Sequence, residues 1–286
     1  MFDIENGQTS RQIIENLHTK NLIKAEWPML ILMKIKETKI KTGAYEIPKG
    51  SKLVEIFNLV ASGEVKETKV TIPEGYRIEQ IAQLLESKKL TAYADFVAAA
   101  KQYEGQLFPD TYYFALNSPA IEIINKMLED YTDRVSGLDV AKEDLIIASI
   151  VEREAVKDDE RALIAGIYRH RLELGMKLQA DPTVQYGRDS NTVAKLNTAN
   201  ASIFDFWQSI STRELLTVES SYNTYIIPAL PPGPICNPGL KSIEASVNYE
   251  KTDYLYFLHK DGQIYPSKTE AEHDQLRASV LGAKIN

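Results

Sequence analysis

Apolar residues are densest in the stretch LIIASIVEREAV, which runs from Leu145 to Val156. At about 3.6 residues per turn it predicts a helix with two largely apolar faces, one ending in Glu152 and the other in Glu154. We expect Glu152 to lie among small side chains, with room beside it for a substrate. Burial favours the protonated form of a carboxyl, which a general acid needs.

The same pattern has a simpler interpretation, in which the apolar run ends because the helix reaches solvent at Glu152. Glu154 lies about 200° further round the helix axis, so the two carboxylates are not expected to meet across one ligand. We interpret Glu154 as structural or solvent-facing.

A repeated pattern organises the first 95 residues. The chain opens with the strand-like FDIENG. The segment DIENGQTSRQIIENLHTKNL, which includes most of this opening, aligns with TIPEGYRIEQIAQLLESKKL, so that Ile4 and Gly7 match Ile72 and Gly75. A partial third copy contains Ile47 and Gly50 at the matching positions. Each copy predicts a short strand, a glycine turn and an amphipathic helix, with Thr9 or Ser10 as the cap of the first helix.

A second helix over 26–35 and a strand over 42–47 complete a strand–helix–helix–strand order, which resembles the glycan-associated LysM-like module. The alternative is that such small units are only architecture, because they are common.

The remaining pattern predicts further short elements. Helices are expected over 94–102, 120–135, 159–174 and 269–281, and strands over 111–114, 178–180, 254–258 and 263–265. Asp181 should cap a helix that begins at Pro182 and ends at Gly187, and Asn237 should cap one that begins at Pro238. Residues 188–207 are expected to form a surface insertion. The fold class is α+β: LysM-like βααβ modules over 1–95, then a mixed α/β domain over 96–286 with small sheets around the Glu152 helix.

Composition narrows the function classes. The 286 residues are 44% hydrophobic and carry a net charge of −7, which disfavours nucleic acid as a partner. Cys236 is the single cysteine, and the four histidines lack metal-ligand spacing, so we expect no disulfide, metal or cofactor. No segment has the roughly 18 apolar residues of a membrane span.

Seven motifs stand in one order along the chain: EGYRIEQIAQLL, EGQLFPDTYYF, IIASIVEREA, LQADPTVQYG, SSYNTY, LPPGPICNPGLKSIEAS and DYLYFL. Together they resemble the MltG/YceG-like endolytic murein transglycosylases over nearly the whole chain. The resemblance implies lytic cleavage of the β-1,4 bond between N-acetylmuramic acid and N-acetylglucosamine in peptidoglycan, which leaves a 1,6-anhydro end. It also implies a catalytic Glu in the IVE segment, which we assign to Glu152.

The chemistry is compatible with a single acid. Most glycosidases need a second carboxylate as nucleophile or as base for water, whereas an intramolecular hydroxyl needs neither. One carboxyl can protonate the leaving oxygen and then accept the proton of the attacking hydroxyl. Motif membership offers eight substrate-binding candidates: Phe108, Tyr112, Gln179, Asp181, Thr183, Tyr222, Asn223 and Tyr225.

The resemblance also implies peptidoglycan strands and cell-wall synthesis proteins as partners. It places the native protein on the periplasmic side of the inner membrane, held by an N-terminal anchor not found in this chain. Two departures concern the outer cleft: Ile264 stands near an expected His, and the insertion over 191–207 is long. Two alternatives stay open, a two-carboxylate hydrolase with Asp181 or Glu219 as base, and a non-catalytic glycan-binding scaffold.

Overall fold

The structure is a computed structural model that describes residues 2–4, 7–36, 40, 42–63 and 66–282. It divides into two compact units that alternate along the chain, and each is described here by itself. The first comprises residues 1–72, 82–99 and 111–125, and the second comprises 73–81, 100–110 and 126–286. Both combine helices with two-stranded antiparallel sheets, or hairpins, so the α+β class is confirmed.

The first unit begins with a βααβ module. Strands β1 (Phe2–Ile4) and β2 (Gly43–Tyr45) pair antiparallel, and α1 (Ser10–Thr19) and α2 (Trp27–Lys36) come between them in sequence. The predicted cap is confirmed at Thr9, whose hydroxyl accepts the N–H of Gln12 at 3.3 Å. The strand–helix–helix–strand order is therefore as predicted; positions 5 and 6 of the expected opening strand lie outside the described residues.

Helix α3 (Leu53–Ser62) joins this module and closes its core. The buried side chains come from every element of the module and include Phe2, Leu17, Met29, Tyr45 and Phe57. Gly50, the glycine of the partial repeat, precedes α3 with a φ of +85°, a conformation that favours glycine. The repeat in the sequence thus corresponds to repeated glycine-turn–helix structure.

The rest of the first unit contains a two-stranded antiparallel sheet. Strands β3 (Glu67–Thr71) and β4 (Thr111–Ala115) pair antiparallel, with Val70 opposite Tyr112. Tyr112 is 4% exposed, and its ring stacks on Phe114 at a centroid distance of 5.6 Å. Three helices follow the predicted pattern near this sheet in sequence: α4 (Ile78–Ser87), α5 (Tyr93–Ala100) and α6 (Ala120–Val135). The first unit contains only residues 82–87 of α4 and 120–125 of α6.

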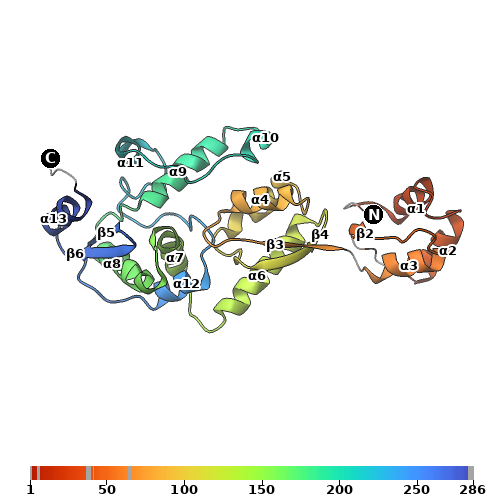
Figure 1. Ribbon diagram of the computed structural model, residues 1–286, viewed down its shortest axis with the longest axis horizontal. Coiled ribbons are helices and arrows are strands. Elements are labelled where there is room, and N and C mark those ends of the chain that lie inside the picture. Colours follow the sequence, from red (N-terminus) through yellow and green to blue (C-terminus); the bar gives the residue numbers. More distant parts are fainter. Residues whose placement is uncertain (1, 5–6, 37–39, 41, 64–65, 283–286) are drawn as a thin grey trace. The chain divides into compact units, whose positions relative to one another are not determined.

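The core of the second unit is built on α7 (Lys142–Glu154), which packs against α8 (Arg161–Glu173) and α12 (Leu240–Val247) (Figure 1). Leu145 to Val151 of α7 are all buried, as the apolar run predicts. The helix starts earlier than expected, where the Asp144 carboxylate accepts the N–H of Ala141 at 2.9 Å. It ends at Glu154, because Ala155 adopts an extended backbone conformation. Both glutamates therefore lie in the last turn.

The remaining elements surround this core. They are α9 (Asp181–Val193), α10 (Thr198–Ala201), α11 (Thr212–Thr217), the hairpin β5 (Tyr256–Lys260) and β6 (Gln263–Ser267), α13 (Glu270–Leu281), and the short 3₁₀ turns η1 (Lys101–Tyr103) and η2 (Asp158–Glu160). The hairpin and α13 confirm their predictions.

Two local predictions in this unit are wrong. Asp181 is the first residue of α9 and not its cap, which is Ala180, and the helix continues past Gly187 to Val193. Gly187 instead allows close packing, since a Cβ there would lie 2.6 Å from the Ser220 hydroxyl. Residues 178–180 form no strand in the structure. The sequence showed a glycine and an apolar triplet, but it did not show which neighbour each would meet.

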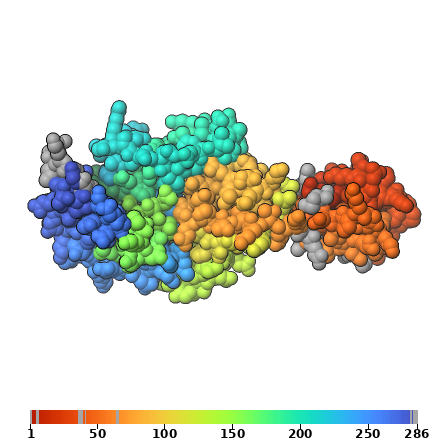
Figure 2. Space-filling view, viewed as in Figure 1, coloured from red at the N-terminus to blue at the C-terminus, as the bar shows by residue number. Residues whose placement is uncertain are grey.

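The predicted surface insertion over 191–207 begins inside α9 and includes α10. The α9–α10 region lies on the surface in Figure 2, in teal, and Ile203 is 79% exposed. Phe206 is only 5% exposed, so the end of the segment packs into the unit. Within the described residues, no helix combines the length and apolarity that crossing a membrane requires.

Candidate active site in the second unit

Glu154, at the end of α7, lines a cavity of about 360 Å³. Its walls come from α7, α8, the start of α9, the β5 strand and α13. The lining residues are Glu154, Tyr168, Arg171, Leu178, Gln179, Asp181, Tyr225, Tyr256, Phe257, Glu270, His273, Asp274 and Arg277. The cavity therefore combines carboxyl, guanidinium, phenol and imidazole groups with aromatic rings.

The surroundings of Glu154 favour its protonated form. Burial raises the pKa of Glu154 to about 7, and the negative charge of Asp181 acts in the same direction. The Tyr168 hydroxyl donates a hydrogen bond to Glu154 at 3.2 Å, which acts in the opposite direction. A carboxyl that is close to half protonated near neutral pH can both give and accept a proton.

The opposite wall is held in place by further hydrogen bonds. The Tyr225 hydroxyl donates to the Asp181 carboxylate at 2.6 Å. Arg171 donates to the Leu255 carbonyl at 2.9 Å and also to the Gln179 side chain. Gln179 has a φ of +53°, which is uncommon for a residue other than glycine and costs free energy that the surrounding contacts must offset. These side chains are therefore fixed around the cavity before any ligand binds.

Glu152 has different surroundings from those predicted. Its side chain is 7% exposed, and its Oε2 accepts hydrogen bonds from the Gly239 N–H at 3.0 Å and the Ser242 hydroxyl at 2.8 Å. Arg161 lies 3.4 Å away. The expected burial is present, but the neighbouring groups are polar and charged instead of small and apolar. Glu152 is also not among the residues that line the Glu154 cavity.

A second carboxyl lies close to this network. Burial raises the pKa of Glu74, and the charge of Glu152 raises it further. The Glu74 carboxylate lies directly over Gly239, where a Cβ would come within 1.9 Å of it. Gly239 is the N-cap residue of α12, so the contacts of both carboxylates hold the beginning of that helix against the end of α7.

A raised pKa by itself does not mark an active site in this unit. Burial raises the pKa of Glu104 to about 8, yet its carboxylate accepts hydrogen bonds from the Ile78 N–H at 3.2 Å and the Asn237 side chain at 3.0 Å. Asn237 does not cap α12, contrary to the prediction; it is fully buried and also accepts the N–H groups of Gly105 and Leu107. Glu104 and Asn237 together tie the loop at residues 104–107 to the core.

Among the candidate binding residues, Gln179, Asp181 and Tyr225 converge on the Glu154 cavity. Thr183 and Asn223 are fully buried. The Thr183 hydroxyl donates to the Ala180 carbonyl at 2.7 Å, and the Asn223 amide donates to the Val218 carbonyl at 2.9 Å. The hydrogen bonds of their side chains therefore lie within the fold.

The aromatic candidates do not line this cavity. Phe108 is 5% exposed, with the Arg134 guanidinium 5.4 Å above its ring, and Tyr112 is buried in the first unit. Tyr222 is partly buried beside Tyr186, at a centroid distance of 4.6 Å. The rings that do line the cavity are Tyr168, Tyr225, Tyr256 and Phe257.

Of the hydrolase alternatives, Asp181 lies in the cavity and Glu219 does not. Glu219 is exposed on the surface, where its backbone carbonyl accepts a hydrogen bond from Asn191 at 2.9 Å. Ile264, at the position of the expected His, packs against the main core of the unit, whereas His273 lines the cavity and stacks on Tyr256 at 5.4 Å.

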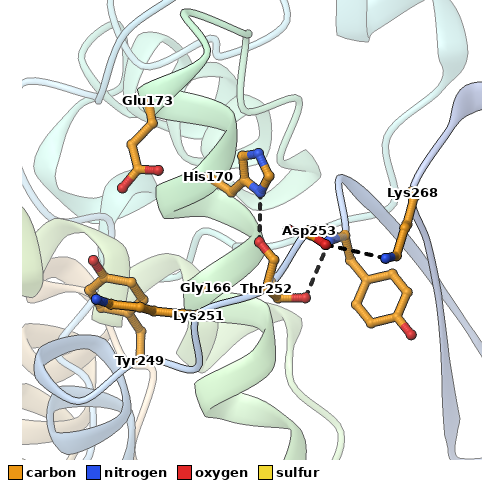
Figure 3. A pocket seen from close by; sticks show the side chains of 9 residues that line it. Gly166, His170, Glu173, Tyr249, Lys251, Thr252, Asp253 and Lys268 are labelled. Carbon is orange, nitrogen blue, oxygen red and sulfur yellow. Dashed lines mark hydrogen bonds and ion pairs between the residues drawn. The ribbon is translucent and has the colours of Figure 1, made fainter.

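A second cavity, of about 560 Å³, lies against another side of α8 (Figure 3). Its floor is rigid, since the Thr252 carbonyl contacts His170 at 2.6 Å and a Cβ on Gly166 would meet the Glu250 carbonyl at 1.9 Å. Asp253 and Lys268 form an ion pair at 3.3 Å. None of the candidate residues from the sequence lines it, and we assign it no role in the chemistry.

The Glu154 cavity is also lined by Glu154 itself, Tyr168 and Arg171, which sequence analysis did not name as candidate site residues. The interpretation of Glu154 as structural or solvent-facing is wrong in its second part, because the residue is partly buried in a cavity. One signal was present: Glu154 continues the face of Ile147, Ile150 and Val151, all fully buried. In the described part of the chain, no group of three or more His, Cys, Asp or Glu side chains could hold a metal ion.

Comparison with known proteins identifies the family. The model of the YceG-like family matches residues 2–279, so this chain belongs to that family. An endolytic murein transglycosylase of Bacillus subtilis (strain 168) is 29% identical, over 99% of this chain and 85% of the relative. One of Streptococcus pneumoniae serotype 2 is 28% identical, over 99% of this chain and 58% of the relative.

A crystal structure at 2.6 Å of a YceG-like protein from Listeria monocytogenes is similar in fold. The TM-score is 0.59 at 31% sequence identity, and the match covers 96% of this chain and 98% of the other. The similarity therefore extends over both units.

Proposed function

We propose that this protein is an endolytic murein transglycosylase that cleaves the glycan strands of peptidoglycan, with Glu154 as its general acid and base. The names of the relatives support the substrate and the reaction type. The observation that carries the residue assignment is the cavity in which Glu154, with a pKa of about 7, lies near Asp181, Gln179 and Tyr225. This proposal moves the catalytic role from Glu152 by two residues.

The proposed reaction needs one carboxyl in two states. Protonated Glu154 donates its proton to the glycosidic oxygen as the bond between N-acetylmuramic acid and N-acetylglucosamine breaks. The 6-hydroxyl of the muramic acid then attacks its own anomeric carbon, and the Glu154 carboxylate accepts the hydroxyl proton. The products are a 1,6-anhydro end and a new 4-hydroxyl, and no water is consumed.

The other cavity residues supply binding and electrostatic stabilisation. The positive charge that develops on the sugar ring in the transition state is favoured by a nearby carboxylate, and Asp181 is the anionic group best placed to provide it. Gln179, Tyr225 and Arg171 can donate or accept hydrogen bonds with acetamido and hydroxyl groups. The partly exposed rings of Tyr256 and Phe257 offer apolar surface to a sugar face.

In this proposal Glu152 is a positioning residue. Its bonds to Gly239, Ser242 and Arg161 hold α12 and α8 against the end of α7. Because Glu154 is in the same helical turn, this network fixes the backbone that carries the proton donor.

A second candidate function is hydrolysis, and one observation favours it. Asp181 lines the same cavity as Glu154, so a water molecule between ligand and Asp181 would give the two-carboxylate arrangement of a glycoside hydrolase. A non-catalytic scaffold is the remaining alternative, in which the βααβ module, if it is LysM-like, would supply the glycan binding.

Product analysis separates these functions. Purified glycan strands without stem peptides are incubated with the protein, and the fragments are identified by mass spectrometry. Fragments with anhydro ends are the expected result. Fragments with reducing ends, which are about 18 Da heavier because they contain one added water, would establish hydrolysis. Fragment lengths distinguish internal from terminal cleavage. Intact strands, with binding retained in a co-sedimentation assay, would refute any catalytic role.

A further inference from the structure

Helix α2 is apolar on both its inner and its outer face. Met29 and Met33 point into the module core and are 0% and 9% exposed. The opposite face, at about 100° per residue, carries Trp27, Leu30, Ile31 and Ile35 within about 140° of arc. Lys34 and Lys36 are the only polar residues of this helix, and a helix so largely apolar is normally covered on most of its sides.

The outer face of α2 is nevertheless exposed. Trp27 is 67% exposed, Leu30 40%, Ile31 49% and Ile35 72%. Elsewhere, large exposed apolar side chains such as Leu174 and Ile203 are spread over different elements. Four on one ten-residue helix form a contiguous patch, and such patches mark contact surfaces more often than isolated apolar residues do.

The segment that carries this patch has a net positive charge. Residues 1–62 contain nine Lys and Arg against seven Asp and Glu, whereas the remaining residues contain 24 against 33. Lys24, just before α2, and Lys34, within it, are exposed, and among the described residues no acidic side chain forms an ion pair with either. The segment that contains this apolar helix face therefore has a net charge of +2, although the whole chain has a net charge of −7.

The position of Lys34 distinguishes between occupants. At helical spacing it lies between Leu30 and Trp27, in the middle of the patch. An apolar protein surface placed there would bury its ammonium group without a partner, at a cost in free energy. A lipid bilayer accommodates it, since the side chain can lie along the acyl region while the charge reaches the phosphates. Tryptophan is likewise favoured at the interface between water and lipid.

We propose that the outer face of α2 docks on a membrane surface that contains anionic phospholipid. The helix lies in the interface and does not span the bilayer. Trp27, Ile31 and Ile35 enter the boundary between headgroups and acyl chains, while Lys24 and Lys34 contact phosphate groups. This role goes beyond the proposed cleavage of glycan strands and needs none of the residues of the Glu154 cavity.

Vesicle flotation tests the docking surface. The full chain is mixed with vesicles of phosphatidylcholine alone or with one third phosphatidylglycerol, and we expect binding to the anionic vesicles that weakens with added salt. The double variant Trp27→Ser/Ile31→Ser should bind at least tenfold less, because burial of each apolar side chain contributes substantially. The matched control Leu174→Ser/Ile203→Ser removes equally exposed side chains from the second unit and should bind as the unchanged protein does.

Three further readouts complete the test. Melting curves of the variants should match that of the unchanged protein, because the substituted side chains are exposed. Cleavage of dissolved glycan strands should also be unchanged, so loss of vesicle binding and loss of activity are separable. Equal binding by both double variants would overturn the proposal. The proposal would also be overturned if the unchanged protein did not bind vesicles but formed concentration-dependent dimers that disappear in Trp27→Ser/Ile31→Ser. The outer face of α2 would then bind a second copy of the chain.

Discussion

Glu152 and Glu154 lie two residues apart in the last turn of α7, yet their side chains meet different surroundings. Glu152 contacts Arg161, the Ser242 hydroxyl and the Gly239 N–H, and these groups stabilise a carboxylate. Glu154 lines a cavity, accepts one hydrogen bond from Tyr168 and lies near the negative Asp181. Because about 200° of helix rotation separates them, one carboxyl joins a network of hydrogen bonds and an ion pair, and the other lines a cavity.

The comparison shows that burial alone does not identify a proton donor. Both carboxyls are removed from bulk solvent, and the difference lies in what replaces the water. Glu152 contacts a guanidinium, a hydroxyl and a backbone N–H, whereas Glu154 lies near the carboxylate of Asp181, whose charge raises its pKa. Assigning chemical roles to the two residues therefore requires the identity of groups distant in sequence, such as Ser242 and Asp181.

The largest expected effect separates the two glutamates directly. Glu154→Gln should lower the rate of strand cleavage by about 10² to 10⁴, because the amide cannot transfer the proton. Its folding should be intact, since glutamine occupies nearly the same volume. The measurement is the rate of anhydro-end formation.

The matched control is Glu152→Gln, which should cleave within severalfold of the unchanged rate while losing some stability. The reverse pattern, with Glu152→Gln folded but inactive and Glu154→Gln active, would return the catalytic role to Glu152.

The second effect concerns stability. Arg161→Met leaves the Glu152 carboxylate, 7% exposed, without its cation, and we expect a loss of about 2–3 kcal/mol in the free energy of unfolding. Urea denaturation measures it. The double variant Glu152→Gln/Arg161→Met should recover part of the loss, because no unpaired charge remains. A loss in the double variant equal to the sum of the losses in Glu152→Gln and Arg161→Met would show that the pair is not coupled.

The third effect is pH dependence. Folding raises the pKa of Glu154 from its usual 4.5 to about 7, so the folded protein binds more protons than the unfolded chain between these values. Stability from this group is therefore fully present below about pH 4.5 and is lost as the pH rises to about 7. Relative to Glu154→Gln, the unchanged protein should lose on the order of 2 kcal/mol between pH 5 and 8.

Activity should follow the same titration. If Glu154 must be protonated first, kcat/KM falls about tenfold per pH unit above about pH 7. Glu104 titrates in a similar range but is present in both proteins, so the comparison with Glu154→Gln removes its contribution to stability. A flat profile between pH 6 and 9 would contradict the assignment of Glu154.

The smallest expected effect is a change in the pKa of Glu154. Tyr168→Phe removes the hydrogen bond that lowers the pKa of Glu154, so the alkaline limb of the activity profile should move to higher pH by less than about one unit. Ser242→Ala removes a comparable hydrogen bond from Glu152 and should leave that limb in place. Equal shifts in both variants would indicate that the two networks are not separate.

Local pattern was sufficient for most elements. The predicted helix over 120–135 coincides with α6, Thr9 caps α1, and the C-terminal hairpin forms around Asp261 and Gly262. These features depend on residues within a few positions of one another. The failures at Gly187 and Asn237 have the opposite origin, because each of these residues meets a partner from a distant part of the chain.

By itself, the sequence determined the periodicities that build the elements, the α+β class and the motif order shared with the YceG-like family. It also placed two glutamates at the end of a buried helix. Only the tertiary structure decided which of them meets a cavity. The elements that pack around the end of α7, namely α8, α9, α12 and the hairpin, lie up to about a hundred residues from it in sequence. Local spacing fixes which residues share a helix face, whereas the electrostatic free energy of a carboxyl depends on whatever packs against that face.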